Sequence, residues 1–128
     1  MRPITKEWID KAEGDWAIAR REMRVRKEPN YDGICFHAQQ CAEKYLKARL
    51  QEADIAFSKT HDLVKLLKAV LAAEPSWNVL EVDLIPLTDF AVDYRYPGIA
   101  ATRTEAKSAV AHCLKVRRVV RRALGLRG

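Results

Sequence analysis

Glycine and proline are scarce in this sequence, which has five of each among its 128 residues. Few tight turns can form from so few of these residues, so we expect long elements joined by short connections. No stretch reaches the roughly 18 consecutive apolar residues of a transmembrane helix. The segment 1–10 also lacks the apolar run of a signal peptide. We therefore expect a cytoplasmic protein with no membrane partner.

Cysteine is infrequent too, and its spacing lacks the C-x-x-C pairs of metal and redox sites. The three cysteines are Cys35, Cys41 and Cys113, and an odd number without such pairs is typical of reduced cytosolic thiols. His37 and Cys41 have the i, i+4 spacing that can hold a metal, but no second ligand pair accompanies them. We therefore predict core cysteines, no metal site and no cofactor.

The familiar signatures of catalysis are also missing. The sequence has no glycine-rich phosphate loop, no Ser-His-Asp order and no close carboxylate pair. It does have 48% hydrophobic and 31% charged residues, which is the balance of an ordinary globular domain. The length fits one domain, and we expect residues 1–128 to form it.

Positive charge exceeds negative charge by six, and much of the excess lies near the C-terminus. One interpretation is a solvated helix end whose cations interact favourably with the helix dipole. The other is a contact for RNA, a nucleotide or an acidic partner protein. The residues concerned are Lys115, Arg117, Arg118, Arg121, Arg122 and Arg127.

Apolar residues recur every three or four positions in five segments, which predicts an all-α, antiparallel up-and-down helical bundle. We expect Thr5 to cap the first helix, Asn30 the second and Thr60 the third. The second segment is apolar over an unusually wide arc. Such a helix is either central to the bundle or also packs against a second subunit.

The last two helices are expected to follow residue 83. Asp83 as N-cap places Pro86 in the first turn, where its missing N–H is tolerated. The buried stripe of this helix is predicted to be Leu84, Leu87, Ala91 and Tyr94. The final helix is expected to start with a capping box at 102–105 and to stop at a glycine at position 125.

Three stretches of this chain together resemble the HEPN domain family (higher eukaryote and prokaryote nucleotide-binding). They are Phe-His-Ala-Gln-Gln-Cys-Ala-Glu-Lys at 36–44, Lys-Thr-His-Asp-Leu at 59–63 and Ala-Val-Asp-Tyr-Arg-Tyr-Pro-Gly at 91–98. The resemblance extends from Trp8 to Leu124. It implies a bundle of four long helices plus a short one, usually present as a homodimer.

The resemblance also implies partners and a function. Many members are encoded beside a minimal nucleotidyltransferase and form two-component systems that behave like a toxin and its antitoxin. We therefore expect a homodimeric subunit that binds this partner and binds nucleotide or RNA. Some members are metal-independent ribonucleases with an arginine followed, after four to six residues, by a histidine. Here Arg95 is the candidate arginine, but Ala100, Ala101 and Thr102 occupy the histidine positions.

Arg95 lies between two tyrosines at the end of the fourth predicted helix. In one interpretation its guanidinium binds a phosphate while Tyr94 or Tyr96 stacks on a base. In the other, Arg95 pairs with Asp93 or Glu43 and braces the turn. The sequence leaves both open.

Two further groups of polar residues are candidates for nucleotide or RNA binding. His37, Gln40 and Lys44 form one strip of the second helix, although hydrogen bonds to a neighbouring helix are the favoured interpretation. Lys59 and His61 flank the start of the third helix, where they either form an anion pocket or, for His61, simply help to cap it.

Two rival functions remain. An atypical ribonuclease would use Arg95 with His37 or His61 in place of the missing histidine. A purely structural dimerisation module would use its polar strip only to set the register of the dimer.

Overall fold

The computed structural model describes the backbone of residues 1–128 and every side chain except that of Ala91. No strand occurs in this described part, and the all-α bundle of four long helices plus a short one is confirmed. The elements are α1 (Pro3–Met23), α2 (Tyr31–Glu52), α3 (Leu63–Val70), the 3₁₀ helix η1 (Pro75–Leu80), α4 (Glu81–Asp93) and α5 (Arg103–Ala123).

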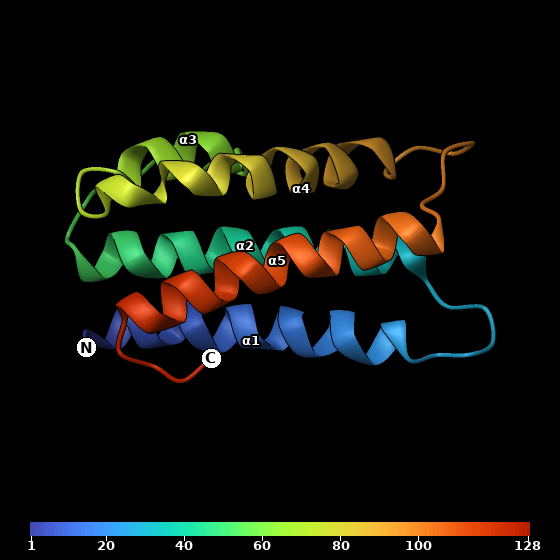
Figure 1. Ribbon diagram of the computed structural model, residues 1–128, viewed down its shortest axis with the longest axis horizontal. Coiled ribbons are helices and arrows are strands. Elements are labelled where there is room, and N and C mark those ends of the chain that lie inside the picture. Colours follow the sequence, from blue (N-terminus) through green and yellow to red (C-terminus); the bar gives the residue numbers. More distant parts are fainter.

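Helix α2 is the centre of the bundle. It packs against α1, α3, α4 and α5, and Figure 1 shows it between α1 on one side and the α3–α4 layer on the other, with α5 running across the front. The connection before α2 and the connection after α4 both lie at the end of the bundle away from the two termini (Figure 1). The residues around these two connections are therefore neighbours in space.

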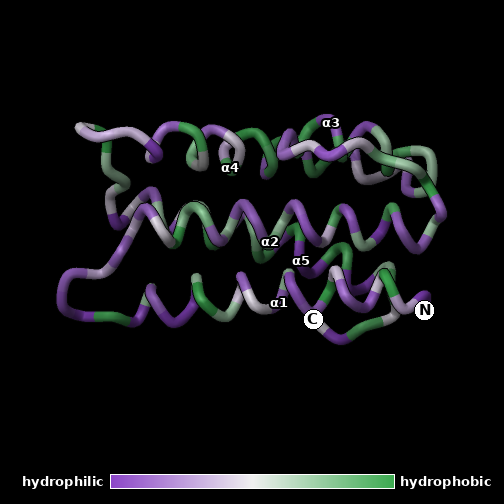
Figure 2. Tube along the Cα trace, turned by 180° about the vertical axis from the view of Figure 1, so that it is seen from behind, coloured by the Kyte–Doolittle hydropathy of each residue, from purple (hydrophilic) through white to green (hydrophobic). Residues whose placement is uncertain are grey.

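The wide apolar arc of α2 faces the core of this chain. Twelve residues of α2 are buried, among them Tyr45, Leu46 and Leu50. Viewed from behind, the chain alternates between hydrophobic and hydrophilic segments along its helices, as expected for helices with one buried face (Figure 2). The second-subunit alternative is therefore not needed to explain this arc.

The three cysteines are free and buried, in agreement with their predicted place in the core. Burial, together with the negative charges of Glu105 and Asp32, raises the pKa of Cys35 to about 12. This thiol therefore stays protonated and is a poor nucleophile.

The predicted caps of α2 and α5 are confirmed. Asn30 accepts a hydrogen bond from the backbone N–H of Gly33 (2.8 Å), and Thr102 and Glu105 form a reciprocal capping box. Gly125 has φ +76° just after α5, as a C-terminal stop requires.

The predicted caps of α1 and α3 are wrong. Helix α1 already begins at Pro3, and Thr5 is buried inside it, where its hydroxyl donates to Glu52 (2.9 Å). Asp62, rather than Thr60, caps α3, because its carboxylate accepts from the first free N–H groups of that helix. Thr60 instead accepts a hydrogen bond from the N–H of Asp62 (3.1 Å).

Helix α4 also starts earlier than predicted. It continues directly from η1 at Glu81, so Pro86 lies inside the helix rather than in its first turn. Asp83 is buried and does not cap; its carboxylate lies 2.9 Å from the ring of His112 on α5. Leu84 and Leu87 are buried as predicted, whereas the side chain of Ala91 lies outside the described residues.

One cluster of charged side chains ties α1, α2 and α5 together. The carboxylate of Glu13 accepts from Arg117 Nε (2.8 Å) and Nη2 (2.7 Å) and from the hydroxyl of Tyr45 (2.5 Å). Burial alone would raise the pKa of Glu13, but the hydrogen bonds from Arg117 and Tyr45 outweigh it and hold the pKa below 4.5.

This lowered pKa predicts a specific acid sensitivity. The unfolded chain binds a proton more readily at Glu13, so the stabilisation is present above pH 4.5 and is lost as pH falls through the lower folded pKa. We expect the melting temperature to fall more steeply below that pH in the wild type than in Glu13→Gln, which lacks the titrating group. Circular dichroism melts across the acid range provide the measurement, and equal slopes would contradict the assignment.

No helix in the described part of the chain is both long enough and apolar enough to cross a bilayer.

Candidate functional site

Arg95 lies in the turn that follows α4, and two contacts fix this turn against the rest of the bundle. The N–H of Ala101 donates to the carboxylate of Asp32 on α2 (2.7 Å). The hydroxyl of Tyr94 donates to Glu105 on α5. Gly98, with φ +90°, reverses the chain between these contacts. The turn is therefore attached to both α2 and α5, and Arg95 lies beside the first half of α2.

A hollow of about 400 Å³ separates the start of α2 from the end of α4, and Arg95 lies on its wall. Its aromatic components are Phe36, Phe90 and Tyr94. The remaining lining is polar and comes from the first turn of α2. The complete set is Asn30, Asp32, Gly33, Phe36, Phe90, Tyr94 and Arg95.

A second, smaller hollow of about 100 Å³ is also lined by Arg95. Arg95 and Phe36 line both hollows, so the two form one continuous surface. We call the residues of both hollows the Arg95 surface. The smaller hollow is lined by Phe36, Gln39, Gln40, His61, Thr88, Val92 and Arg95.

His61 is held in place by Glu43. Its Nδ1 lies 3.0 Å from the Glu43 carboxylate, which is 3% exposed, while the His61 side chain is 76% exposed. Gln39 donates to the backbone carbonyl of His61 (3.3 Å) and to Glu43 (3.2 Å). The contact with Glu43 uses Nδ1, so Nε2 is the ring nitrogen available to a ligand. His61 does not cap α3, because Asp62 does.

Arg95 is exposed and forms no ion pair in the described part of the chain. The bracing pair with Asp93 or Glu43 is absent, since Glu43 binds Lys47 (3.1 Å) and His61 (3.0 Å) instead. The guanidinium of Arg95 therefore retains its full hydrogen-bonding capacity beside the two hollows.

The polar strip of α2 mainly binds other helices of the same chain. His37 Nδ1 lies 2.8 Å from Asp15 on α1, and Lys44 Nζ lies 2.5 Å from the same carboxylate. Neither residue lines the Arg95 surface, so the structural interpretation holds for both. Gln40 does line it, and also donates to Gln39 (2.8 Å).

Of the remaining predicted site residues, one lines the Arg95 surface and three do not. Tyr94 lines the larger hollow, but one face of its ring stacks on Phe90, with centroids 6.0 Å apart. Tyr96 is 64% exposed, and Asp93 and Lys59 are also exposed; none of these three lines either hollow.

Phe36 and Asp32 are the residues of this surface whose roles sequence reasoning missed. Phe36 lies between the two hollows, and Asp32 holds the turn that carries Arg95. The sequence does contain a signal for these two residues. Spacings of three and four place them on one face of α2 with two glutamines, the full set being Asp32, Phe36, Gln39 and Gln40. That face packs near α4, a fact that depends on tertiary structure.

Among the described residues, no group of three or more histidine, cysteine or acidic side chains is arranged to hold a metal. The arrangement offers instead a free guanidinium, an aromatic face and a carboxylate-bound imidazole. These groups can bind a phosphate, stack on a base and accept or donate a proton, respectively.

Comparisons with known proteins agree with the fold. The model of the HEPN domain family matches residues 5–123. TT1696 from Thermus thermophilus is 26% identical, with a TM-score of 0.74 over 92% of this chain and 96% of that one. ST0689, described as an archaeal HEPN homologue, is 25% identical, with a TM-score of 0.71 over 96% of this chain and 98% of that one. No curated protein matches. Because the family model covers nearly the whole sequence, the chain belongs to the HEPN domain family.

Proposed function

We propose that this chain is a homodimeric HEPN subunit that binds a nucleotide or RNA at the Arg95 surface. We further propose that it works with a minimal nucleotidyltransferase in a two-component system of the toxin–antitoxin type. Membership of the HEPN family supports a nucleotide- or RNA-related function in general terms. The particular partner is proposed because the three sequence stretches resemble those members that occur in such pairs.

The observation that carries the binding proposal is a guanidinium without an ion pair beside an exposed aromatic ring. Arg95 presents a planar fork of donors that matches the oxygens of a phosphate. Phe36 is 40% exposed and offers a face on which a base can stack. The larger hollow, at about 400 Å³, falls within the size range of small-ligand sites. Together these features suit one phosphate and one base.

The proposed dimer rests on the outer face of α4. Val82, Ile85 and Val92 share one side of this helix and are 67%, 44% and 54% exposed. Val79 on η1, 62% exposed, extends the patch. An apolar strip of this kind favours association with a second copy, and a twofold axis would place identical strips against each other. Val92 also lines the smaller hollow, so this apolar strip adjoins the Arg95 surface.

Substitution of Arg95 tests the binding site. We expect Arg95→Ala to weaken binding of a fluorescently labelled ATP by about 10- to 100-fold, the usual worth of hydrogen bonds to a charged group. Arg95→Lys should recover only part of this loss, because an ammonium lacks the planar fork. Fluorescence titration measures both. Lys65→Ala is the matched control, since it removes one exposed cation from α3. An equal loss in that variant would contradict a site at Arg95.

The atypical ribonuclease is the second candidate, because Arg95 and His61 line the same hollow. In that reaction the imidazole would take the proton of the 2′-hydroxyl, whose oxygen would attack the adjacent phosphorus and displace the 5′-oxygen of the next nucleotide. The imidazolium would return the proton to that leaving oxygen, while Arg95 stabilised the charge on the phosphate oxygens. The single variants Arg95→Ala and His61→Ala can each be assayed for RNA cleavage in the presence of a chelator. His37→Ala is the control, because His37 binds Asp15 away from this surface. Cleavage that required His61 but not His37 would favour the nuclease over the binding subunit.

A further inference from the structure

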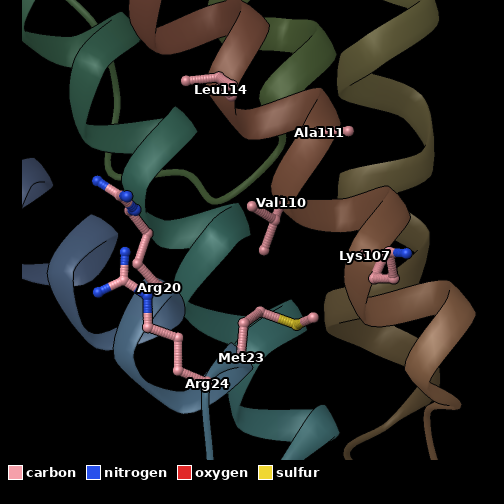
Figure 3. Close-up of a pocket in the computed structure, with 7 residues that line it drawn as sticks. All are labelled: Arg20, Met23, Arg24, Lys107, Val110, Ala111 and Leu114. Carbon is pink, nitrogen blue, oxygen red and sulfur yellow. The ribbon is translucent and has the colours of Figure 1, made fainter.

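A second basic surface lies between α1 and α5, and none of its residues lines the Arg95 surface. Its first part is a hollow of about 380 Å³. Met23, Val110 and Leu114 supply apolar lining between the two helices. In Figure 3, Arg20 on α1 lies near Arg24, the residue that follows α1, and Lys107 lies on α5 on the far side of Val110.

The second part is a hollow of about 320 Å³ toward the connection between α1 and α2. Arg24, Arg26 and Arg103 surround it, with the ring of Tyr31 also on its wall. Arg24 and Met23 line both parts, so the two hollows are continuous. We call the residues of these two hollows the α1–α5 groove.

The charges of this groove are not neutralised by the fold. No carboxylate lines either hollow, and among the described residues none of the five cations takes part in an ion pair. Two partly buried arginines behave differently: Arg49 pairs with Glu74 (3.0 Å) and Arg117 with Glu13 (2.7 Å). Five unpaired cations repel one another, so their clustering opposes stability and suits an anionic ligand. The five are Arg20, Arg24, Arg26, Arg103 and Lys107.

The alternation of charge and apolar surface identifies the occupant. A second copy of this chain is unsuitable, because a twofold interface would place the five cations against the same five cations. A single-stranded polynucleotide carries one phosphate and one flat base per unit, and proteins bind it with basic grooves that also offer stacking faces. Four of the five cations are arginines, whose forks bind phosphate bidentately. Tyr31 supplies a ring, and Met23 and Val110 supply an apolar surface.

We propose that the α1–α5 groove binds a single-stranded polynucleotide, with phosphates on the arginines and bases on Tyr31 and the apolar lining. The groove lies toward the end of the bundle that carries the Arg95 turn (Figure 1). A strand bound in the groove would thus extend toward that end. The proposal does not depend on nucleotide binding at Arg95, since the two sets of lining residues do not overlap.

Fluorescence anisotropy with a labelled oligouridylate of about 12 nucleotides tests this groove. The double variant Arg24→Ala/Arg103→Ala removes one cation that lines both hollows and one on the opposite wall. We expect its dissociation constant to rise at least about tenfold, and the slope of log affinity against log salt to become shallower by about 1.4, or about 0.7 for each lost phosphate contact. All of the substituted side chains are exposed, so folding should be retained, and circular dichroism checks this.

Lys65→Ala/Lys68→Ala is the matched control. It removes the same charge from exposed positions of α3, and we expect its affinity to stay within about twofold of the wild type. Equal losses in both double variants would overturn the proposal, because binding would then follow net charge alone. Absence of binding by the wild type, or equal binding of an acidic peptide of the same charge, would also overturn it. The deoxy oligomer separates RNA from DNA: equal affinity supports a site for either polymer, and preference for RNA supports recognition of the 2′-hydroxyl.

Arg95→Ala separates this proposal from the one above. Loss of labelled ATP binding with unchanged oligouridylate affinity at the groove supports two distinct sites. Oligouridylate affinity that depended on Arg95 and not on Arg24 and Arg103 would overturn the groove.

Discussion

Glu43→Ala is expected to lower the free energy of unfolding by about 3–5 kcal/mol, the usual cost of removing one partner from a buried ion pair. The Glu43 side chain is 3% exposed and that of Lys47 is 9% exposed, and their charged atoms lie 3.1 Å apart. Without the carboxylate, the ammonium of Lys47 would stay buried with no acceptor from that side. The rings of Trp8 and Phe57, 5.3 Å and 6.0 Å from it, offer only weak compensation.

Urea denaturation followed by circular dichroism measures this loss. Glu43→Leu/Lys47→Met should recover most of it, because replacing both members of a buried pair by apolar residues is often neutral or stabilising. The exposed Glu7→Ala is the control and should change stability by no more than about 0.5 kcal/mol. If Glu43→Ala stayed within about 1 kcal/mol of the wild type, the pair would not be buried in the way the geometry indicates.

The helices were predictable because their signals are local. The periodicity of the apolar residues and the caps at Asn30 and Thr102 involve neighbours in sequence, and both caps form as expected. Two of the wrong caps have a common cause. The hydroxyl of Thr5 is engaged by Glu52, 47 positions away, and Asp83 by His112, 29 positions away. In both cases the side chain that local rules assigned to a helix cap instead contacts a residue that is distant in the sequence.

The candidate site was less predictable than the fold. Arg95 was a candidate because of its place in the family pattern, but spacing alone did not show whether His37 or His61 lies beside it. Both histidines lie next to a carboxylate, yet His37 is bound to α1 through Asp15 while His61 lines the hollow beside Arg95. Which helix covers which face of α2 decides between them, and that depends on long-range packing rather than on local spacing.

Ile85→Asp is expected to dissociate the proposed dimer. Ile85 is central to the apolar strip of α4, so in the variant each of the two chains would bury an unpaired carboxylate in the interface. The substitution is present in both chains of a twofold dimer, so its effect is doubled. We expect the dimer dissociation constant to rise by at least about a thousandfold, which corresponds to about 4 kcal/mol in the free energy of dimerisation. Light scattering coupled to size-exclusion chromatography measures the mass as a function of concentration. Ile85 is 44% exposed in the single chain, so the fold of the monomer should tolerate the change.

Ile18→Asp provides a closely matched control, because Ile18 is also 44% exposed but lies on α1. It should leave the dimer intact. Dissociation by Ile18→Asp alone would move the interface to α1, and a wild type that stays monomeric at high concentration would remove the dimer altogether. Val92 joins the strip to the smaller hollow, so loss of the dimer should also weaken nucleotide binding if two Arg95 surfaces act together. Unchanged binding by monomeric Ile85→Asp would instead make each Arg95 surface complete within one chain.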